Sequence, residues 1–287
     1  MQSRTISVSS LNRHYIVYIP DSYYTQKFVS LVIMLHGGGG TARGAMEETG
    51  WIEKAKKEGF IAAFPEAVRR DESQPPRFLR NPQFWNDGSG RAHSGRENID
   101  DVGFIDAMID DLMSSYVIDK RKIFISGFSN GASMTYRAGV ELSKRIAAIA
   151  PVSGHLWTKP EKLEREVSVL AITGVEDPLN PFNGGETVNP WGDNEIKPQM
   201  ADSVKTWAGL LGCSDGHEVI NDGDGVKTIS CGKCRNGAEA LFCAIDGLGH
   251  VWPGGKSLLH ERIVGKGSDR LNATDAIWQF FIEHTIP

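Results

Sequence analysis

Apolar runs of strand length alternate with helical patterns along most of this chain of 287 residues. The run at residues 31–35 is continuously apolar, which is typical of a strand buried on both faces of a parallel sheet. Further strands are predicted at residues 60–64, 122–126, 147–152, 167–173 and 240–245, and helices at residues 46–58, 102–116 and 131–145. This order predicts an α/β fold whose mainly parallel sheet carries helices on both faces.

The start of the chain has a different pattern. Residues 6–8 and 14–19 alternate apolar and polar positions, with residues 11–13 between them, which predicts an antiparallel hairpin. No shift in composition marks a boundary, and the length suits one large domain with a buried core. A single α/β domain is therefore predicted over residues 1–287.

Two segments interrupt the regular pattern, at residues 69–97 and 177–196. Long loops in compact domains are more often functional than idle, although the first of these could simply cover an edge of the sheet. Aromatic residues stand within both segments, and they are Phe78, Phe84, Trp85, Phe182 and Trp191.

Charge narrows the range of partners. The 36 acidic residues only slightly exceed the 31 Lys and Arg residues, and both signs are interspersed. Neither nucleic acid nor an anionic membrane is an expected partner, and a small uncharged or mildly polar substrate fits better. The N-terminus lacks the basic start and apolar core of a secretory signal, so we expect either a cytoplasmic protein or a mature form without its leader.

The segment Gly127-Phe128-Ser129-Asn130-Gly131 matches the pattern G-x-S-x-G. It follows a predicted strand directly and opens a predicted helix, which is the context of a nucleophile elbow. In such a turn the two glycines avoid steric clashes, and the serine hydroxyl projects above the sheet at the positive end of the helix. Ser129 is the candidate nucleophile, and the simpler alternative is that it only caps the helix.

A serine hydroxyl needs a base to take its proton and an acid to orient that base. In α/β-hydrolases the order along the chain is Ser, then Asp or Glu, then His. His250 stands in a glycine-framed loop after the strand at residues 240–245 and is the predicted base. Asp177 follows the strand at residues 167–173 and is the predicted acid, with its neighbour Glu176 as the competitor.

Stabilisation of an oxyanion requires two backbone donors that are already in place. Asn130, directly after the candidate nucleophile, is one predicted donor, and Gly38 in the glycine loop at residues 36–40 is the other. His36 is expected to hold this loop and not to act as the base. The alternative for four consecutive glycines is an ordinary flexible turn.

Four segments in this order resemble bacterial extracellular esterases related to polyhydroxybutyrate depolymerases and feruloyl esterases. They are Leu-His-Gly-Gly-Gly from residue 35, Asp-Asp-Val-Gly-Phe from residue 100, Gly-Phe-Ser-Asn-Gly-Ala from residue 127 and Gly-His-Val-Trp-Pro-Gly from residue 249. The last is the most specific, because His followed by Trp-Pro-Gly is unusual among α/β-hydrolases. The resemblance implies that fold, with Ser129, Asp177 and His250 as nucleophile, acid and base.

The resemblance also implies that Trp252 and the loop after Asp177 lie near the acyl or aromatic part of a substrate. Trp85 is a further candidate for the pocket wall, since it is an aromatic residue in a polar irregular loop, although burial against the sheet is an equal alternative. Asp100 and Asp101 precede a predicted helix, and we expect them to serve its N-terminus and not to form a catalytic carboxylate pair.

The cysteines lie close together, between residues 213 and 243. Cys231 and Cys234 have the spacing of half a zinc site, but a zinc site normally needs a second close pair of ligands, so disulfides are favoured. The family resemblance implies a bond from Cys213 to Cys234 and secretion of the protein. Cys231 and Cys243 depart from the family pattern, and they are either a second bridge or free thiols.

These features together predict a serine esterase that works through an acyl-enzyme without a metal or organic cofactor. Feruloyl or related hydroxycinnamoyl esters, small or linked to a polysaccharide, are the expected substrates, because aromatic residues fall in the loops that should border the pocket. Short polyhydroxyalkanoate esters are the alternative. Acyl transfer to another alcohol and a non-catalytic binding protein of the same fold are further hypotheses.

Overall fold

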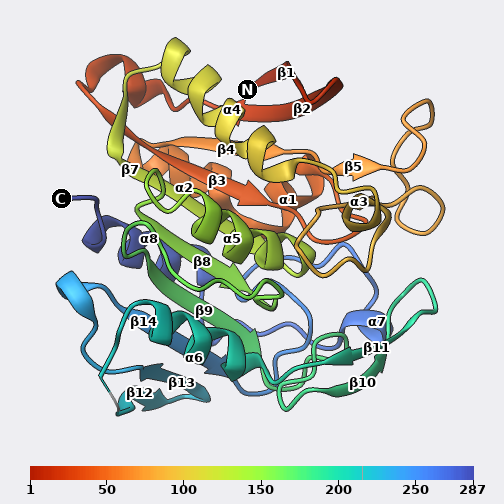
Figure 1. Cartoon of the computed structure of the whole chain (residues 1–287), viewed down its shortest axis with the longest axis vertical. Coiled ribbons are helices and arrows are strands. Elements are labelled where there is room, and N and C mark those ends of the chain that lie inside the picture. The colour runs from red at the N-terminus through yellow and green to blue at the C-terminus, as the bar shows by residue number, and fades with distance from the viewer. Residues whose placement is uncertain (215) are drawn as a thin grey trace.

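A sheet of ten strands forms the centre of the molecule in the computed structural model, which describes residues 1–214 and 216–287. Its strand order is β1-β2-β4-β3-β7-β8-β9-β14-β13-β12, from the top to the bottom of Figure 1. The bounds are β1 Gln2–Val8, β2 Leu11–Tyr18, β3 Val29–Leu35, β4 Ile61–Pro65, β7 Ile118–Phe128, β8 Ala148–Val152, β9 Ser168–Gly174, β12 Glu218–Gly223, β13 Val226–Ser230 and β14 Ala240–Ile245.

The six central strands, from β4 to β14, all run parallel to one another. Antiparallel pairs extend the sheet at both edges, through β2 and β1 on one side and through β13 and β12 on the other. The carboxyl ends of the parallel strands therefore meet at one edge, which is where ligands bind in open α/β sheets.

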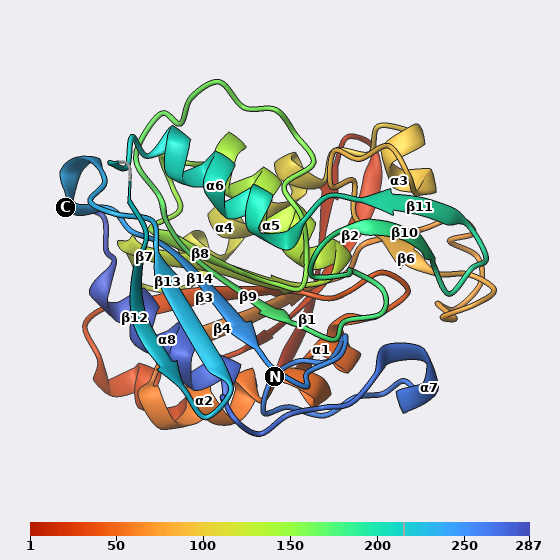
Figure 2. The ribbon, with the colours of Figure 1, turned by 90° about the horizontal axis from the view of Figure 1, so that it is seen from below.

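Helices cover both faces of the sheet (Figure 2). Helices α4 (Asp101–Ser115), α5 (Asn130–Glu141) and α6 (Met200–Leu210) lie on one face, and α1 (Ala42–Thr49), α2 (Trp51–Glu58) and α8 (Ala273–Glu283) lie on the other. Alternate residues of β3 enter the two cores: Leu31 and Ile33 pack with the first group, and Val32 and Met34 with the second. This packing confirms the predicted α/β architecture.

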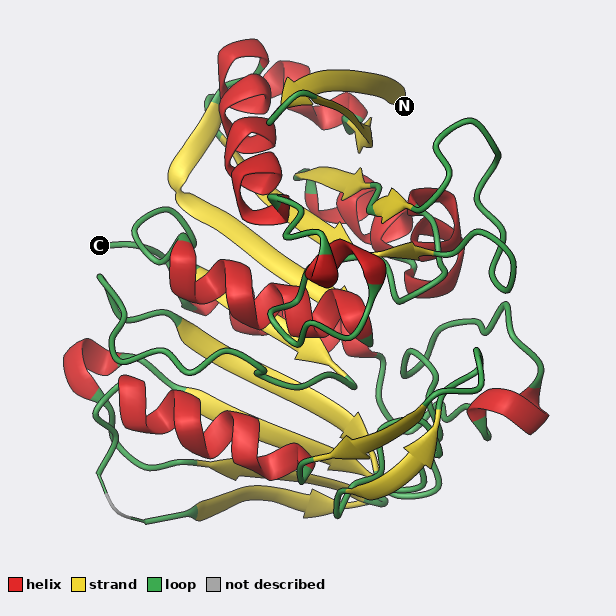
Figure 3. Ribbon diagram, turned by 45° about the vertical axis from the view of Figure 1, so that its right-hand side comes forward, coloured by secondary structure: helices red, strands yellow, loops and turns green. Residues whose placement is uncertain are grey.

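The remaining short elements gather at the carboxyl end of the parallel strands, on the right of Figures 1 and 3. They include β10 (Gly185–Val188) and β11 (Asn194–Lys197), which form a hairpin, β5 (Val68–Arg69) and β6 (Gln83–Phe84), which pair, and the helical turns α3 (His93–Arg96) and α7 (Glu261–Val264). Two 3-10 turns, η1 (Asp21–Thr25) and η2 (Arg235–Gly237), lie elsewhere. No described helix is long and apolar enough to span a bilayer.

The hairpin at the start of the chain is confirmed, but its turn was misplaced. Ser9 and Ser10 make the turn, and both have positive φ values, of 48° and 68°. Two-residue hairpin turns of this hand usually use Asn or Gly, so a Ser-Ser pair carries little signal. Residues 11–13, expected to be the turn, belong to β2.

The single helix predicted over residues 46–58 is wrong, because the structure has two helices there. Gly50 ends α1 and begins α2 with φ of 69°, a left-handed conformation that interrupts a helix. Gly59 ends α2 with φ of 81°, as predicted. The helix predicted over residues 131–145 is also shorter, since α5 ends at Glu141.

A disulfide joins Cys213 to Cys234, as the family resemblance implied. It ties the end of α6 to the segment between β13 and β14. Of these elements, the apolar pattern predicted β14 but not α6 or β13. Cys231 and Cys243 are buried free thiols, and they pack in the cores on opposite faces of the sheet. A second bridge between them is therefore not formed.

A buried ion pair joins β2 to α4 and also holds the irregular segment at residues 69–97. Arg13 of β2 donates to Asp101 at 2.6 Å, and both side chains are almost fully buried. The other carboxylate oxygen of Asp101 accepts a hydrogen bond from the backbone N–H of Asn86 at 2.6 Å. Asp100 caps α4 through Gly103 at 2.8 Å, as predicted, whereas the Asp101 carboxylate bonds to Arg13 and Asn86 and does not cap the helix.

We expect Asp101→Ala to lower the free energy of unfolding by about 3–5 kcal/mol, because the variant leaves the Arg13 guanidinium buried without its partner. Urea denaturation measures this loss. The matched control is Glu164→Ala, which removes an exposed ion pair with Lys144 and should cost about 0–1 kcal/mol. Similar small losses in both variants would contradict the structural role of the buried pair.

Candidate active site

Ser129 stands in a strained turn between β7 and α5. Its φ and ψ are 56° and −119°, a region that non-glycine residues rarely occupy. The turn needs glycine on both sides: a Cβ at Gly127 would lie 2.3 Å from the Gly131 carbonyl oxygen, and a Cβ at Gly131 would lie 2.3 Å from that of Leu35. The G-x-S-x-G pattern therefore marks the sharp turn that the sequence predicted.

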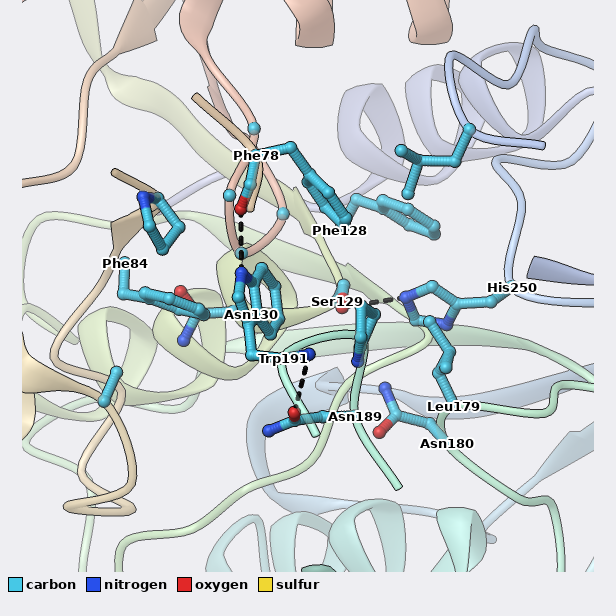
Figure 4. Close-up of a pocket in the computed structure, with 18 of the residues that line it drawn as sticks. Phe78, Phe84, Phe128, Ser129, Asn130, Leu179, Asn180, Asn189, Trp191 and His250 are labelled. Atoms are coloured by element: carbon cyan, nitrogen blue, oxygen red, sulfur yellow. Dashed lines mark hydrogen bonds between the residues drawn. The ribbon is translucent and has the colours of Figure 1, made fainter. Parts of the chain in front are cut away.

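The Ser129 hydroxyl points toward His250 and makes no capping bond to α5, although Ser129 occupies the N-cap position. Its Oγ lies 2.8 Å from Nε2 of His250 (Figure 4). This contact discards the alternative in which Ser129 serves only as a helix cap. A hydroxyl at this distance can donate its proton directly to the imidazole.

His250 is held between Ser129 and Asp177. Its Nδ1 lies 2.7 Å from Oδ2 of Asp177, and both side chains are at least 95% buried. The other carboxylate oxygen accepts hydrogen bonds from the backbone N–H groups of Leu179 and Asn180, each at 2.8 Å. The Asp177 carboxylate therefore accepts a hydrogen bond from Nδ1–H of His250, and Nε2 is left as the acceptor for the Ser129 hydroxyl.

Glu176, the competing acid, is exposed to solvent. Its backbone N–H donates to the Leu248 carbonyl oxygen at 3.0 Å, which fixes the turn before Asp177. The structure therefore brings Asp177, and not Glu176, to the histidine. Sequence alone left this choice open, because two adjacent residues after a strand point in different directions.

Two N–H groups of the glycine loop after β3 already have backbone acceptors. Gly39 donates to the Gln83 carbonyl oxygen at 2.7 Å, and Gly40 donates to that of Gly37 at 3.0 Å. His36 holds the loop as expected: its Nε2 accepts from the Ala67 N–H at 3.1 Å, and its Nδ1 lies 2.7 Å from the Gly37 carbonyl oxygen. Burial lowers the pKa of His36, in keeping with a neutral ring.

Gly38 and Asn130, the predicted oxyanion donors, lie side by side beneath Phe84. A Cβ at Gly38 would lie 2.6 Å from the Phe84 ring and 3.6 Å from the Asn130 side chain. Asn130 is the first residue of α5, so its N–H has no acceptor within the helix. Gly39 and Gly40 already donate to backbone carbonyl oxygens, so Gly38 stays the predicted donor of this loop.

The side chain of Asn130 is clamped by the irregular segment. Its Oδ1 accepts from the Trp85 N–H at 2.8 Å, and its Nδ2 donates to the Trp85 carbonyl oxygen at 3.2 Å and to Asp87 at 2.9 Å. The long loop at residues 69–97 thus orients the residue after the candidate nucleophile. Its three hydrogen bonds to Asn130 gave no signal in the sequence.

Trp85 does not line the pocket, which corrects one expectation. Its indole is 1% exposed, and Nε1 donates to the His36 carbonyl oxygen at 2.9 Å behind the glycine loop. The equal alternative, burial against the sheet, is therefore the correct one. Trp252 does reach the pocket lining, although it is almost fully buried and bonds to Thr274 at 3.0 Å.

Three aromatic side chains from the irregular loops form the wall that Trp85 was expected to provide. The ring centroid of Trp191 lies 5.1 Å from that of Phe78 and 4.8 Å from that of Phe84, and its Nε1 donates to the Phe78 carbonyl oxygen at 2.7 Å. Figure 4 shows Phe84 and Trp191 on the side of Ser129 away from His250. They border a pocket of about 590 Å³ that also contains Ser129 and His250.

Glu48 of α1 is a further ionisable group in this pocket, and sequence reasoning missed it. Burial raises its pKa to about 7, while a hydrogen bond from the Leu258 N–H and the nearby His250 act in the opposite direction. Among the residues that the structure describes, no group of three His, Cys, Asp or Glu side chains could hold a metal ion.

This chain is similar in sequence and in fold to known proteins. The model of the phospholipase/carboxylesterase family matches residues 24–207, which is more than half of the chain. The acetyl xylan esterase from Aspergillus awamori has a similar structure, with a TM-score of 0.62 over 98% of this chain and 100% of that one. At 17% sequence identity, that likeness concerns the fold alone.

Curated relatives extend the similarity beyond the family match. Feruloyl esterase C of Emericella nidulans is 26% identical over 97% of this chain and 87% of its own length. Feruloyl esterase B of Piromyces equi is 27% identical over 85% of this chain, but the match spans only 44% of that protein.

The raised pKa of Glu48 makes stability depend on pH. Between the usual value of 4.5 and about 7, the folded state keeps a proton that the unfolded chain releases, so this residue's contribution to stability falls as pH rises. We expect Glu48→Gln to gain stability relative to the wild type between pH 5 and pH 8, as measured by urea denaturation. The exposed residue Glu53 supplies the control, Glu53→Gln, and an equal gain there would contradict the assignment to Glu48.

Proposed function

This chain belongs to the phospholipase/carboxylesterase family of α/β-hydrolases, and we propose that it hydrolyses carboxylic esters through an acyl-enzyme on Ser129. The observation that carries the proposal is the continuous line of hydrogen bonds from Ser129 through His250 to Asp177, at 2.8 Å and 2.7 Å. The three groups have the roles of nucleophile, base and acid in such chemistry.

The reaction follows from these contacts. Ser129 attacks the ester carbonyl while Nε2 of His250 takes its proton, and the Asp177 carboxylate stabilises the imidazolium that forms. The N–H groups of Gly38 and Asn130 bind the carbonyl oxygen as it becomes an oxyanion. His250 then gives the proton to the leaving alcohol, and a water molecule activated by the same histidine releases the acid from Ser129.

We propose feruloyl or related hydroxycinnamoyl esters, free or linked to a polysaccharide, as the substrates. The aromatic wall formed by Phe78, Phe84 and Trp191 supports this class, because flat rings pack well against one another. Two relatives that bear the name feruloyl esterase agree with it. The disulfide from Cys213 to Cys234 is in keeping with a secreted protein, since oxidising compartments favour such bonds.

The proposed roles predict a graded series of losses. Ser129→Ala should abolish labelling by a fluorophosphonate probe and reduce kcat by roughly a million-fold. Asp177→Asn should reduce kcat by about 10⁴-fold, because the altered side chain no longer holds the required tautomer of His250. Glu176→Gln is the matched control and should hydrolyse esters at nearly the wild-type rate. Labelling that persists in Ser129→Ala would refute the serine mechanism.

The substrate class is tested by comparing kcat/KM for methyl ferulate, methyl butyrate and hydroxybutyrate oligomers. We expect methyl ferulate to react fastest, and Trp191→Ala to lower its kcat/KM about tenfold while changing that of methyl butyrate much less, since a ring in the pocket loses its packing partner. A wild-type preference for the hydroxybutyrate oligomers would favour the depolymerase-like alternative. Product analysis with an added alcohol would detect acyl transfer.

A further inference from the structure

The pocket contains a second histidine that the proposed mechanism does not use. His155 follows β8, lines the same pocket as Ser129 and is 1% exposed. Its backbone N–H donates to the hydroxyl of Ser133 at 3.1 Å. Ser133 lies in α5, one helical turn beyond Ser129, so this bond ties His155 to that helix. Within residues 1–214 and 216–287, however, neither ring nitrogen has a hydrogen-bond partner.

Further polar groups without partners lie next to this ring. The centroid of Trp157 is 5.2 Å from that of His155, and the Arg91 guanidinium stacks over the same indole at 4.1 Å. Nε1 of Trp157 and Nε of Arg91 also have no hydrogen-bond partner in the described part of the chain. A buried polar group without a partner is costly, so this cluster has hydrogen-bonding capacity that the described part of the chain does not use.

The charged groups beside the cluster balance one another. Arg91 bonds to Asp87 at 3.3 Å and to Glu195 at 3.2 Å, and Glu195 also pairs with Lys197 at 2.5 Å. Lys197, Glu195, Asp87 and Arg91 all line the pocket. Two cations and two anions leave no net charge, so this region does not select a carboxylate or a phosphate.

His155 itself adds no charge. Burial, followed by the nearby Lys197 and Arg91, lowers its pKa to about 3. A neutral imidazole carries one N–H donor and one nitrogen acceptor. A hydroxyl group has the complementary pair of functions, because it can donate one hydrogen bond and accept another.

We propose that His155, together with Arg91, forms a subsite that binds a neutral hydroxyl group of the ester substrate. This inference rests on the proposed esterase function and specifies what the enzyme recognises beyond the carbonyl. The hydroxyl belongs either to the acyl part, as a phenol, or to the alcohol part, as in a sugar. Both sources present the same donor and acceptor to the ring.

Two pairs of esters distinguish the sources. Methyl 4-hydroxycinnamate against methyl cinnamate tests the acyl part, and 2-hydroxyethyl cinnamate against propyl cinnamate tests the alcohol part. We expect wild-type kcat/KM to favour the hydroxylated member at least tenfold in one pair, because a site built to bond a hydroxyl rejects the analogue that lacks it. A ratio near one in both pairs would overturn the subsite, whatever the absolute rates.

Variants connect the preference to the histidine. His155→Phe should bring the ratio close to one, and His155→Gln, which retains a donor and an acceptor, should keep part of the preference. His284→Phe, at the end of α8, is the matched control and should leave the ratio at its wild-type value. An unchanged ratio in correctly folded His155→Phe would also overturn the proposal.

Binding to Ser129→Ala separates this inference from the proposed function. Calorimetry should show tighter binding of the hydroxylated ester than of its partner, and the difference should disappear when His155→Phe is added. If this binding difference appears but the wild type hydrolyses none of the esters, the subsite is supported and the proposed esterase function is refuted. Hydrolysis of every ester, with neither turnover nor binding sensitive to the hydroxyl, would refute the subsite alone.

Discussion

The left-handed backbone of Ser129 is the constraint on which the arrangement of the site depends. Its φ of 56° costs of order 1–3 kcal/mol and persists only because the surroundings fix it. The Ser129 N–H donates to Val152 of the neighbouring strand at 2.9 Å, and a Cβ at Gly154 would lie 2.6 Å from the Ser129 carbonyl oxygen. Glycines at positions 127, 131 and 154 thus allow two strands and a helix to meet closely enough to hold this turn.

The two irregular loops, at residues 69–97 and 177–196, meet beside that turn and together complete the site. One loop clamps Asn130 through Trp85 and Asp87, and the other reaches the same place through the β10–β11 hairpin. Arg91 joins them, because it bonds to Asp87 in its own loop and to Glu195 in the hairpin. Segments about a hundred residues apart are therefore connected to the proposed oxyanion donor by one continuous set of polar contacts.

The local order of elements could be predicted from the sequence, because apolar runs and the G-x-S-x-G turn act over a few residues. The strand at residues 240–245 coincides with β14, and the order of Ser129, Asp177 and His250 placed each after its own strand. Features that depend on distant contacts could not be found in this way. Trp85 is buried because its indole meets the His36 carbonyl oxygen, a contact 49 residues away along the chain that no local pattern records.

The choice between Glu176 and Asp177 also depends on a contact with a distant part of the chain, which the local sequence pattern does not record. Both carboxylates follow β9, but the turn that begins with the bond from the Glu176 N–H to Leu248 directs only Asp177 inward. There the carboxylate accepts from two backbone N–H groups as well as from His250. These bonds offset the cost of burying a charge and fix its position before any substrate arrives. The catalytic groups of the proposed site therefore need little reorganisation during the reaction, because the backbone already holds the acid, the base and the oxyanion donors in place.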